Sequence, residues 1–174
     1  GDVIELRGFR DGGAEKLRTD YLDFAFDRPL DDTPPAAFRV QAESFAPVAG
    51  FAVATRAVAS GGAVLEATSN AEQIARSEFT GADGVYDLGL GYYDENDGVA
   101  RMRVFVNDVA LDDWLWDQDL GEAGISPANL VERAIEDVVL RTGDVIELRG
   151  FRDGGAEKLR TDYLDFQFVD DLIV

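Results

Sequence analysis

The chain has 174 residues, a length that suits one domain with a sizeable core and is short for two. Its 35 acidic residues outnumber 16 Lys and Arg residues, and the resulting net charge of −19 argues against a nucleic-acid partner. The absence of His and Cys excludes Ser-His and Cys-His catalysis, the usual zinc sites and disulfides. No apolar run approaches the ~20 residues that span a bilayer, so we expect no membrane insertion. General solubility, adaptation to saline water and recruitment of hard divalent cations each account for the acid excess.

An exact internal repeat organises the chain. The segment Gly1–Phe24 recurs without a change at residues 143–166, after which Ala25 stands against Gln167 while Phe26 and Phe168 agree again. A tandem array of near-identical modules and an artificial duplication both account for this pattern.

The repeat suggests four segments. We interpret residues 1–26 as a duplicate of a module's last two strands, left from a preceding repeat. Residues 27–37 are rich in Pro and Asp and predict an extended linker. Residues 38–169 then form one complete module, and residues 170–174 a short tail.

Short alternating runs between turn signals predict an almost wholly β structure. In the run at residues 85–92, for example, the larger side chains alternate with Asp and Gly, as a half-buried strand requires. Residues 126–135, with Pro127 near their start, are the one stretch expected to hold a brief helical turn. The fold class is therefore all-β, a two-sheet antiparallel β-sandwich. The expected strands are residues 38–43, 63–67, 73–79, 85–92, 99–107, 110–116, 144–149 and 159–168.

Three stretches together resemble a known family. They are VQAESF at residues 40–45, FTGADGVYDLGLGYYDENDG at residues 79–98, and the closing GDVIELRGFRDGGAEKLRTDYLDF at residues 143–166. They are similar to the calcium-binding carbohydrate-binding modules of family 6 and their relatives, within the galactose-binding-like group. The resemblance implies a jelly-roll sandwich that binds a polysaccharide with the help of Ca²⁺ and performs no catalysis. It also implies an extracellular or cell-surface location in a bacterial protein with repeated modules.

A first cation site is expected where the two ends of the module meet. Gln41 and Glu43 lie two residues apart in an expected strand, so their oxygens project from one face. The resemblance pairs them with Asp162 in the last strand, which would tie first and last strands together through Ca²⁺. The alternative is an ordinary polar face on an edge strand.

A second acidic cluster follows the strand at residues 85–92. Asp94, Asn96 and Asp97 are candidate calcium ligands, and Glu95 between them is a candidate contact to sugar hydroxyls. The spacing is not that of an EF-hand. A solvated turn built from good turn formers is the alternative reading.

Two tryptophans are candidate platforms for a sugar ring, because flat aromatic side chains pack against the apolar faces of pyranoses. Trp114 and Trp116 alternate with Leu115 and should share one face, close to Asp117 and Asp119 as polar contacts. Core positions for both tryptophans are the alternative, and for at least one of them this is the stronger expectation.

Two further segments complete the expected ligand site. Tyr92 and Tyr93 should point to opposite faces, so one of them should face solvent, and Tyr93 is the candidate ligand contact. The loop before the last strand would place hydrogen-bond donors and acceptors beside the tryptophan platform, namely Arg152, Asp153, Glu157, Lys158 and Arg160.

These features leave three candidate functions in order. The first is a non-catalytic, calcium-dependent polysaccharide-binding module. The second is a structural repeat of a surface adhesin that assembles by strand exchange. Either copy of the repeated segment could complete the sandwich. The unpaired copy could then pair with another molecule, which would give a homo-oligomer or a head-to-tail chain. The third is a carboxylate-pair enzyme using Asp94 and Asp117, which nothing in the sequence specifically supports.

Overall fold

The computed structural model describes residues 33–152, 154 and 156–172. The chain divides into two units, residues 1–33 and residues 34–174, and every described strand belongs to the second. The duplicate at residues 1–26 and most of the expected linker lie outside the described residues, as does Asp153. The regular elements run from Phe38 to Asp170.

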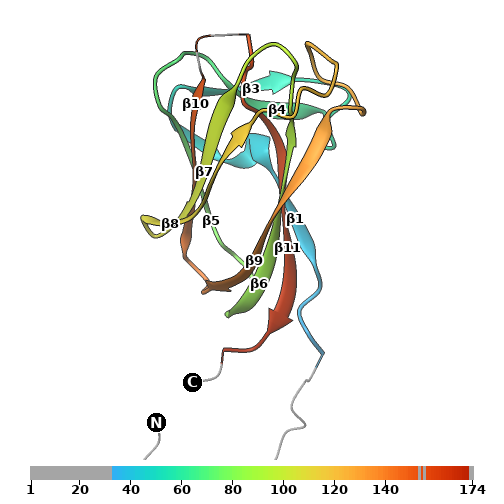
Figure 1. The fold of residues 1–174 in the computed structure, drawn as a ribbon. Helices are drawn as coiled ribbons and strands as arrows, with labels where there is room; N and C mark the ends of the chain where they lie inside the picture. Colours follow the sequence, from blue (N-terminus) through green and yellow to red (C-terminus); the bar gives the residue numbers. More distant parts are fainter. Residues whose placement is uncertain (1–32, 153, 155, 173–174) are drawn as a thin grey trace, which may run out of the picture. The chain divides into compact units, whose positions relative to one another are not determined.

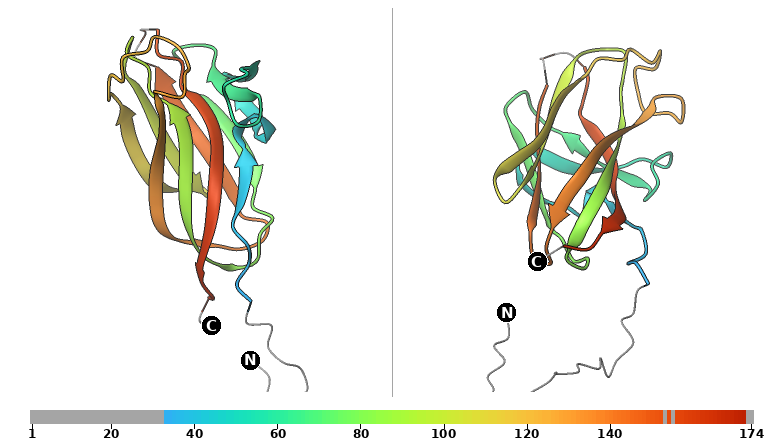
Figure 2. Two further views of the ribbon diagram at one scale, coloured as in Figure 1. Left: turned by 90° about the vertical axis from the view of Figure 1, so that its right-hand side faces the viewer. Right: turned by 60° about the horizontal axis from the view of Figure 1, so that its bottom comes forward.

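Two antiparallel sheets face each other, which confirms the predicted fold class (Figures 1 and 2). One sheet has the order β3-β4-β11-β6-β9, and β1 pairs with β11 beside this path. The strands of this first sheet are β1 (Phe38–Gln41), β3 (Phe51–Thr55), β4 (Ala63–Ala67), β6 (Gly84–Tyr93), β9 (Leu130–Leu140) and β11 (Arg160–Asp170). The second sheet has the order β2-β5-β10-β7-β8. Its strands are β2 (Ala46–Ala49), β5 (Gln73–Glu78), β7 (Ala100–Val106), β8 (Val109–Trp116) and β10 (Val145–Arg152).

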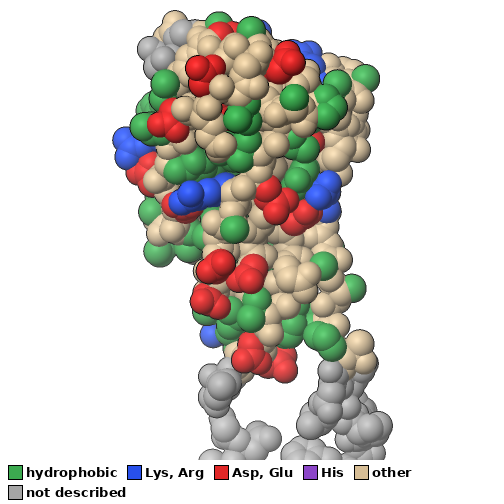
Figure 3. Space-filling view, turned by 45° about the vertical axis from the view of Figure 1, so that its right-hand side comes forward, with side chains coloured by type: hydrophobic (Ala, Val, Ile, Leu, Met, Phe, Trp, Pro, Cys, Tyr) green, Lys and Arg blue, Asp and Glu red, His purple; other side chains and the backbone are tan. Residues whose placement is uncertain are grey.

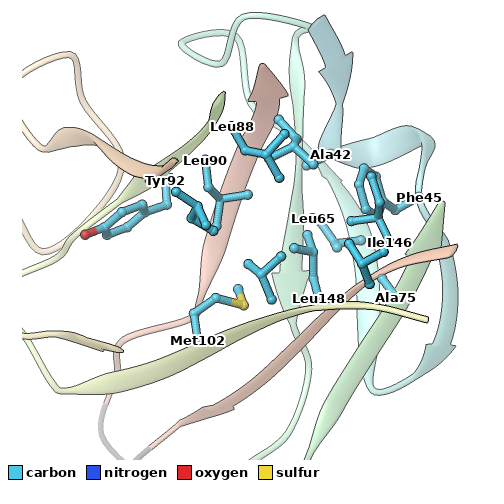
Figure 4. Close-up of a cluster of buried hydrophobic side chains, with 14 of the residues drawn as sticks. Ala42, Phe45, Leu65, Ala75, Leu88, Leu90, Tyr92, Met102, Ile146 and Leu148 are labelled. Carbon is cyan, nitrogen blue, oxygen red and sulfur yellow. The ribbon is translucent and has the colours of Figure 1, made fainter. Parts of the chain in front are cut away.

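The core lies between the two sheets (Figure 4). The predicted core-facing residues of β6 are confirmed, because Tyr86, Leu88, Leu90 and Tyr92 are all at most 2% exposed. The expected half-buried alternation holds only in the first half of the strand, because Gly89 and Gly91 on the other face are buried as well. Met102 on β7 is also fully buried, as are the core-facing residues of β10. Burial of this apolar surface at about 25 cal/mol per Å² is the main term that holds the sheets together.

The edge strands β2 and β3 were not predicted from the sequence. In β2 every residue is exposed, and β3 carries two alanines and only one fully buried residue, Phe51. Neither segment therefore shows the alternation of large apolar and polar residues that identifies a half-buried strand.

The brief helical turn expected within residues 126–135 is wrong. A turn occupies residues 126–129, in which the Ser126 amide donates to Asn129 Oδ1 at 2.9 Å, and β9 starts at Leu130. Strand β9 pairs with β6 along nearly its whole length. Pairing with a neighbouring strand thus overrides the weak local preference that Pro127 suggested.

The two ends of the sandwich differ in what they carry. The loops that follow β6, β8 and β10 gather at the upper end in Figure 1, here called the rim. The start of β1 and the end of β11 lie together at the opposite end. Asp and Glu side chains are spread over the face drawn in Figure 3, with Lys and Arg at fewer places. Among the described residues, no helix is long and apolar enough to cross a membrane.

Candidate functional site

The first group of oxygen ligands, here called the junction site, joins the start of the module to its last strand. Asp162 on β11 accepts hydrogen bonds from the Ser60 amide at 3.0 and 3.1 Å and from Ser60 Oγ at 3.0 Å. The same hydroxyl lies 2.8 Å from Gln41 Oε1, so its single proton is shared between the two acceptor oxygens. The loop between β3 and β4 thereby links the end of β1 to β11, although Gln41 and Asp162 are far apart in sequence.

Glu43 enters this group by a different route from the one expected. It lies in a short 3-10 helix, η1 (Ala42–Ser44), because β1 ends at Gln41. Its carboxylate nevertheless lies near the side-chain amide of Gln41, because both groups approach Gly61. A Cβ added to Gly61 would collide with Glu43 Oε1 and lie 2.9 Å from Gln41 Oε1.

The junction site suits a hard cation. Glu43 Oε2 is buried and has no hydrogen-bond partner among the described residues, which is costly for a carboxylate oxygen. The absence of a side chain at Gly61 leaves room beside the convergent oxygens. Carboxylate and amide oxygens are the ligands that Ca²⁺ prefers.

Tyr93 supports the junction site and does not face solvent, so its expected role in ligand contact is wrong. Its side chain is 1% exposed, and its hydroxyl donates to Asp162 Oδ2 at 3.2 Å. Burial and the neighbouring Asp162 raise the pKa of Tyr93, which keeps it a neutral donor. Tyr92 is buried as well, so neither tyrosine is the expected solvent-facing one.

A second group lies at the rim. Glu95, Asp97 and Glu157 each place a carboxylate oxygen within 4.8 Å of the others, and we call them the rim cluster. Glu157 Oε2 accepts a hydrogen bond of 2.9 Å from the Glu95 amide, and the Asp97 carbonyl accepts one of 3.2 Å from the Ala156 amide. These bonds tie the loop after β6 to the loop before β11.

The rim cluster has more negative charge than its surroundings neutralise. Glu95 and Glu157 are at most 1% exposed, and Glu95 forms an ion pair with Arg160 Nη1. Arg160 is shared, because its Nε also contacts Glu66 at 2.9 Å. Glu95 Oε2 and Asp97 Oδ1 are buried and have no hydrogen-bond partner among the described residues.

The electrostatic consequence appears at Glu157. Burial, together with the charges of Asp94 and Asp97, raises the pKa of Glu157 to about 7. A carboxylate held in this way binds either a proton or a cation, so the rim cluster fits a divalent ion with oxygen ligands.

The remaining acidic residues of the rim lie around this cluster. Asp94 is buried, accepts the Gln118 amide at 3.3 Å, and its pKa is raised by burial and by Asp117 and Asp119. Asp117 and Asp119 are exposed. Asn96 is also exposed, and its amide donates to the Glu122 carbonyl at 2.9 Å. Of the three expected calcium ligands in this loop, only Asp97 therefore belongs to the rim cluster.

The two tryptophans have different environments. Trp116 is fully buried and stacks on Tyr92 at 4.2 Å, so its expected role as a sugar platform is wrong and the core alternative holds. Trp114 is half-buried, with the Arg133 guanidinium 5.5 Å from its ring centre. Of the pair, only Trp114 retains exposed surface, and part of it packs against the core.

The remaining features of the site were either placed differently from their prediction or not predicted at all. Arg152, a predicted ligand contact, is half-buried at the end of β10. Ser60 was not predicted, because it acts through partners that lie far away in the chain. Arg160 was expected to contact the ligand, and it instead forms an ion pair with Glu95. Sequence reasoning also missed a hollow of about 450 Å³ on the outer face of the first sheet, lined in part by Arg39, Glu132 and Asp165.

No protein-family model matches the chain. An alignment over 108 residues, which covers 59% of this chain, is 27% identical to alpha-glucuronidase A of Aspergillus tubingensis. The probable alpha-glucuronidase A of Aspergillus niger is 26% identical over the same length. The match covers only 13% of either enzyme.

Solved structures match the fold more completely. A family 35 carbohydrate-binding module from Clostridium thermocellum has a TM-score of 0.58 at 16% identity, covering 77% of this chain and 99% of that one. The CBM36-1 domain of a multidomain xylanase, from the hindgut metagenome of Trinervitermes trinervoides, has a TM-score of 0.54 at 18% identity and covers 77% and 98%. A CBM36 module in complex with calcium and xylotriose has a TM-score of 0.51 at 14% identity and covers 75% and 99%. The chain therefore has the β-sandwich fold of carbohydrate-binding modules.

Proposed function

We propose that the chain is a non-catalytic module that binds polysaccharide in a calcium-dependent manner, as part of an extracellular protein. The observation that carries the proposal is the rim cluster, in which Glu95, Asp97 and Glu157 converge with buried oxygens that lack partners. A divalent cation supplies the charge that Arg160 alone does not. An ion held at the rim by protein carboxylates keeps positions for ligand oxygens, and sugar hydroxyls are suitable neutral ligands.

The two cation sites have different roles in this proposal. At the junction site, Gln41, Glu43 and Asp162 would hold Ca²⁺ that joins the first and last strands and stabilises the fold. At the rim, the ion would contact the sugar. Trp114, Asp117 and Asp119 are the candidate direct contacts, because they keep exposed surface close to the loop that carries Asp94.

The chemistry of the rim and the names of the structural neighbours support a class of polysaccharide ligand. Vicinal hydroxyls of a neutral chain can coordinate a hard cation without adding charge to an already acidic protein. One structural neighbour was solved with calcium and xylotriose, another belongs to a xylanase, and a third is an exo-beta-1,3-galactanase from Phanerochaete chrysosporium. We therefore place xylan and β-1,3-galactan first among the polysaccharides to test.

Affinity electrophoresis tests the proposal. Native gels with each soluble polysaccharide should slow the protein in millimolar CaCl₂, and the substitution Asp97→Asn should abolish the retardation while Glu132→Gln leaves it unchanged. Glu132 serves as the matched control because it lines the separate hollow on the first sheet. If the Asp97→Asn variant is retarded as strongly as the parent protein, the sugar does not bind at the rim cluster. Release of reducing sugar from the retained polymer would refute the non-catalytic role.

A structural spacer in a surface adhesin is the second candidate function. Burial of Trp116 favours it, because only one of the two tryptophans remains to contact a sugar. This candidate predicts a calcium-dependent melting temperature with no retardation on any polysaccharide.

A further inference from the structure

Arg160 lies between two carboxylates, one inside the rim cluster and one outside it. It is the first residue of β11 and is buried. Its Nε contacts Glu66 Oε2 at 2.9 Å, and its Nη1 forms an ion pair with Glu95 of the rim cluster. Because the guanidinium is planar and rigid, contacts to both carboxylates fix its position and its orientation. The positive charge of Arg160 is therefore held next to the rim cluster.

The carboxylate outside the cluster, Glu66, is neutralised without the charge of Arg160. Arg56 Nη2 contacts Glu66 Oε2 at 2.6 Å, and Lys158 Nζ lies 3.7 Å from Glu66 Oε1. Three cationic side chains thus surround a single carboxylate. The charge of Arg160 is consequently left to act on Glu95, whose Oε2 is buried and has no hydrogen-bond partner among the described residues.

This charge offsets part of the negative charge of the rim cluster. If it were removed, the same carboxylate oxygens would carry one more uncompensated negative charge. The energy of a bound ion in that field is proportional to the charge of the ion, so the added negative charge would favour a trivalent ion over a divalent ion. The charge of Arg160 opposes this preference.

We propose that Arg160 is the residue that sets the charge selectivity of the rim cluster, making it discriminate against trivalent cations relative to divalent ones. The inference rests on the proposed function, because it takes the rim cluster as a cation site. At an effective dielectric constant of about 20 and a separation of about 6 Å, one unit charge changes the affinity for another by roughly a hundredfold. Loss of the Arg160 charge should therefore raise the ratio of trivalent to divalent affinity by about ten- to a hundredfold.

Calorimetric titration with Ca²⁺ and with Tb³⁺ tests the proposal in the full-length chain. Tb³⁺ is close to Ca²⁺ in size, prefers the same oxygen ligands and has one more positive charge. The rim cluster is identified as the site whose binding is lost in Asp97→Asn. In Arg160→Gln the ratio of Tb³⁺ to Ca²⁺ affinity at this site should rise as stated, at the same pH as the parent. The ratio is the useful quantity because misplaced ligands weaken the binding of both ions together.

Arg56→Gln is the matched control. It also removes one arginine from Glu66, but the contacts of Arg56 are to Glu66 and to the Thr55 carbonyl, away from the rim cluster. Its side chain is partly exposed, so solvent and salt screen its charge. The affinity ratio in Arg56→Gln should stay within about threefold of the parent value.

Arg160→Lys separates charge from geometry, and it decides the question if Arg160→Gln does not give the near-ultraviolet circular dichroism of a folded protein. A lysine keeps the charge, but its compact ammonium group cannot reproduce the planar fork that contacts Glu66 and Glu95 together. Both ions should therefore bind more weakly while the ratio of their affinities stays near the parent value. A tenfold or larger rise of the ratio in Arg160→Lys would show that ligand geometry sets the selectivity, and would overturn the inference.

The remaining outcomes distinguish this inference from the proposed function. If the parent binds both ions at the rim cluster and folded Arg160→Gln has an unchanged ratio, the charge selectivity does not come from Arg160, while the proposed function stands. If the parent binds neither ion at the rim cluster, the proposed function and this inference are both wrong.

Discussion

Glu157 Oε2 accepts a hydrogen bond of 2.9 Å from the backbone amide of Glu95, which fixes two buried carboxylates of different loops next to each other. Two buried negative charges in contact raise the free energy of burying each carboxylate, unless a proton or a cation lies between them. The backbone thus enforces the arrangement that side-chain repulsion opposes. This relationship is the physical basis for placing a cation at the rim.

Removal of calcium should lower the melting temperature through the junction site. A ligand present at 100 times its dissociation constant stabilises by about 2.7 kcal/mol, or roughly 5–10 °C for a chain of this size. Gly61→Ala places a methyl group against Glu43 and Gln41 and should remove much of the difference between calcium and chelator. Gly124→Ala, where a Cβ meets nothing within 4 Å, should keep it. Equal calcium shifts in the two variants, measured by differential scanning fluorimetry, would remove the junction site from the account.

The two tryptophans should separate stability from binding. Trp116→Ala leaves a cavity in the core and should cost about 3–5 kcal/mol of unfolding free energy. Trp114→Ala should cost roughly half as much, because the side chain is only half-buried, but should weaken polysaccharide binding. Leu115→Ala is the exposed control between them. Urea denaturation and affinity electrophoresis on the same variants make the comparison, and unchanged binding in Trp114→Ala would exclude this ring from the site.

Glu66 should make stability depend on pH in the acid range. Burial acts to raise its pKa, but the hydrogen bond from Arg160 and the charges of Arg160, Arg56 and Lys158 outweigh burial and lower the pKa below its ordinary value of 4.5. A depressed folded-state pKa gives stability that is complete above about pH 4.5 and is lost as the pH falls through the folded-state value.

The variant Glu66→Gln isolates this contribution from the other carboxylates. At pH 7 it should be less stable than the parent by about 1–3 kcal/mol, the value of a charge-assisted hydrogen bond. The difference should shrink as both proteins are compared in urea at successively lower pH. A difference that stays constant down to pH 3 would show that the charge of Glu66 is not what stabilises this region.

Much of the fold could be predicted because it is encoded in local alternation. Strand β6 shows this well, since Tyr86, Leu88 and Leu90 occupy one face in the sequence and in the structure. Edge strand β2 and the long β9 lack such a pattern, and their pairing with β5 and β6 decides their conformation.

The candidate site was predictable only in part, because it is assembled from distant loops. The grouping of Gln41 and Glu43 with Asp162 came from a resemblance to a family, and the structure brings their oxygens to the same loop around Ser60 and Gly61. The approach of Glu157 to Glu95 depends on a backbone hydrogen bond across the rim, which no local spacing indicates. Burial of Trp116 likewise depends on its contact with a tyrosine of the opposite sheet.

The measurement that tests the central claim most directly is retardation of the intact chain in gels containing xylan or β-1,3-galactan, run with CaCl₂ and with a chelator. The account predicts retardation on at least one polymer in calcium, its loss in chelator and its return when calcium is restored. Equal mobility with and without calcium on both polymers, for a protein that remains folded, would contradict calcium-dependent polysaccharide binding.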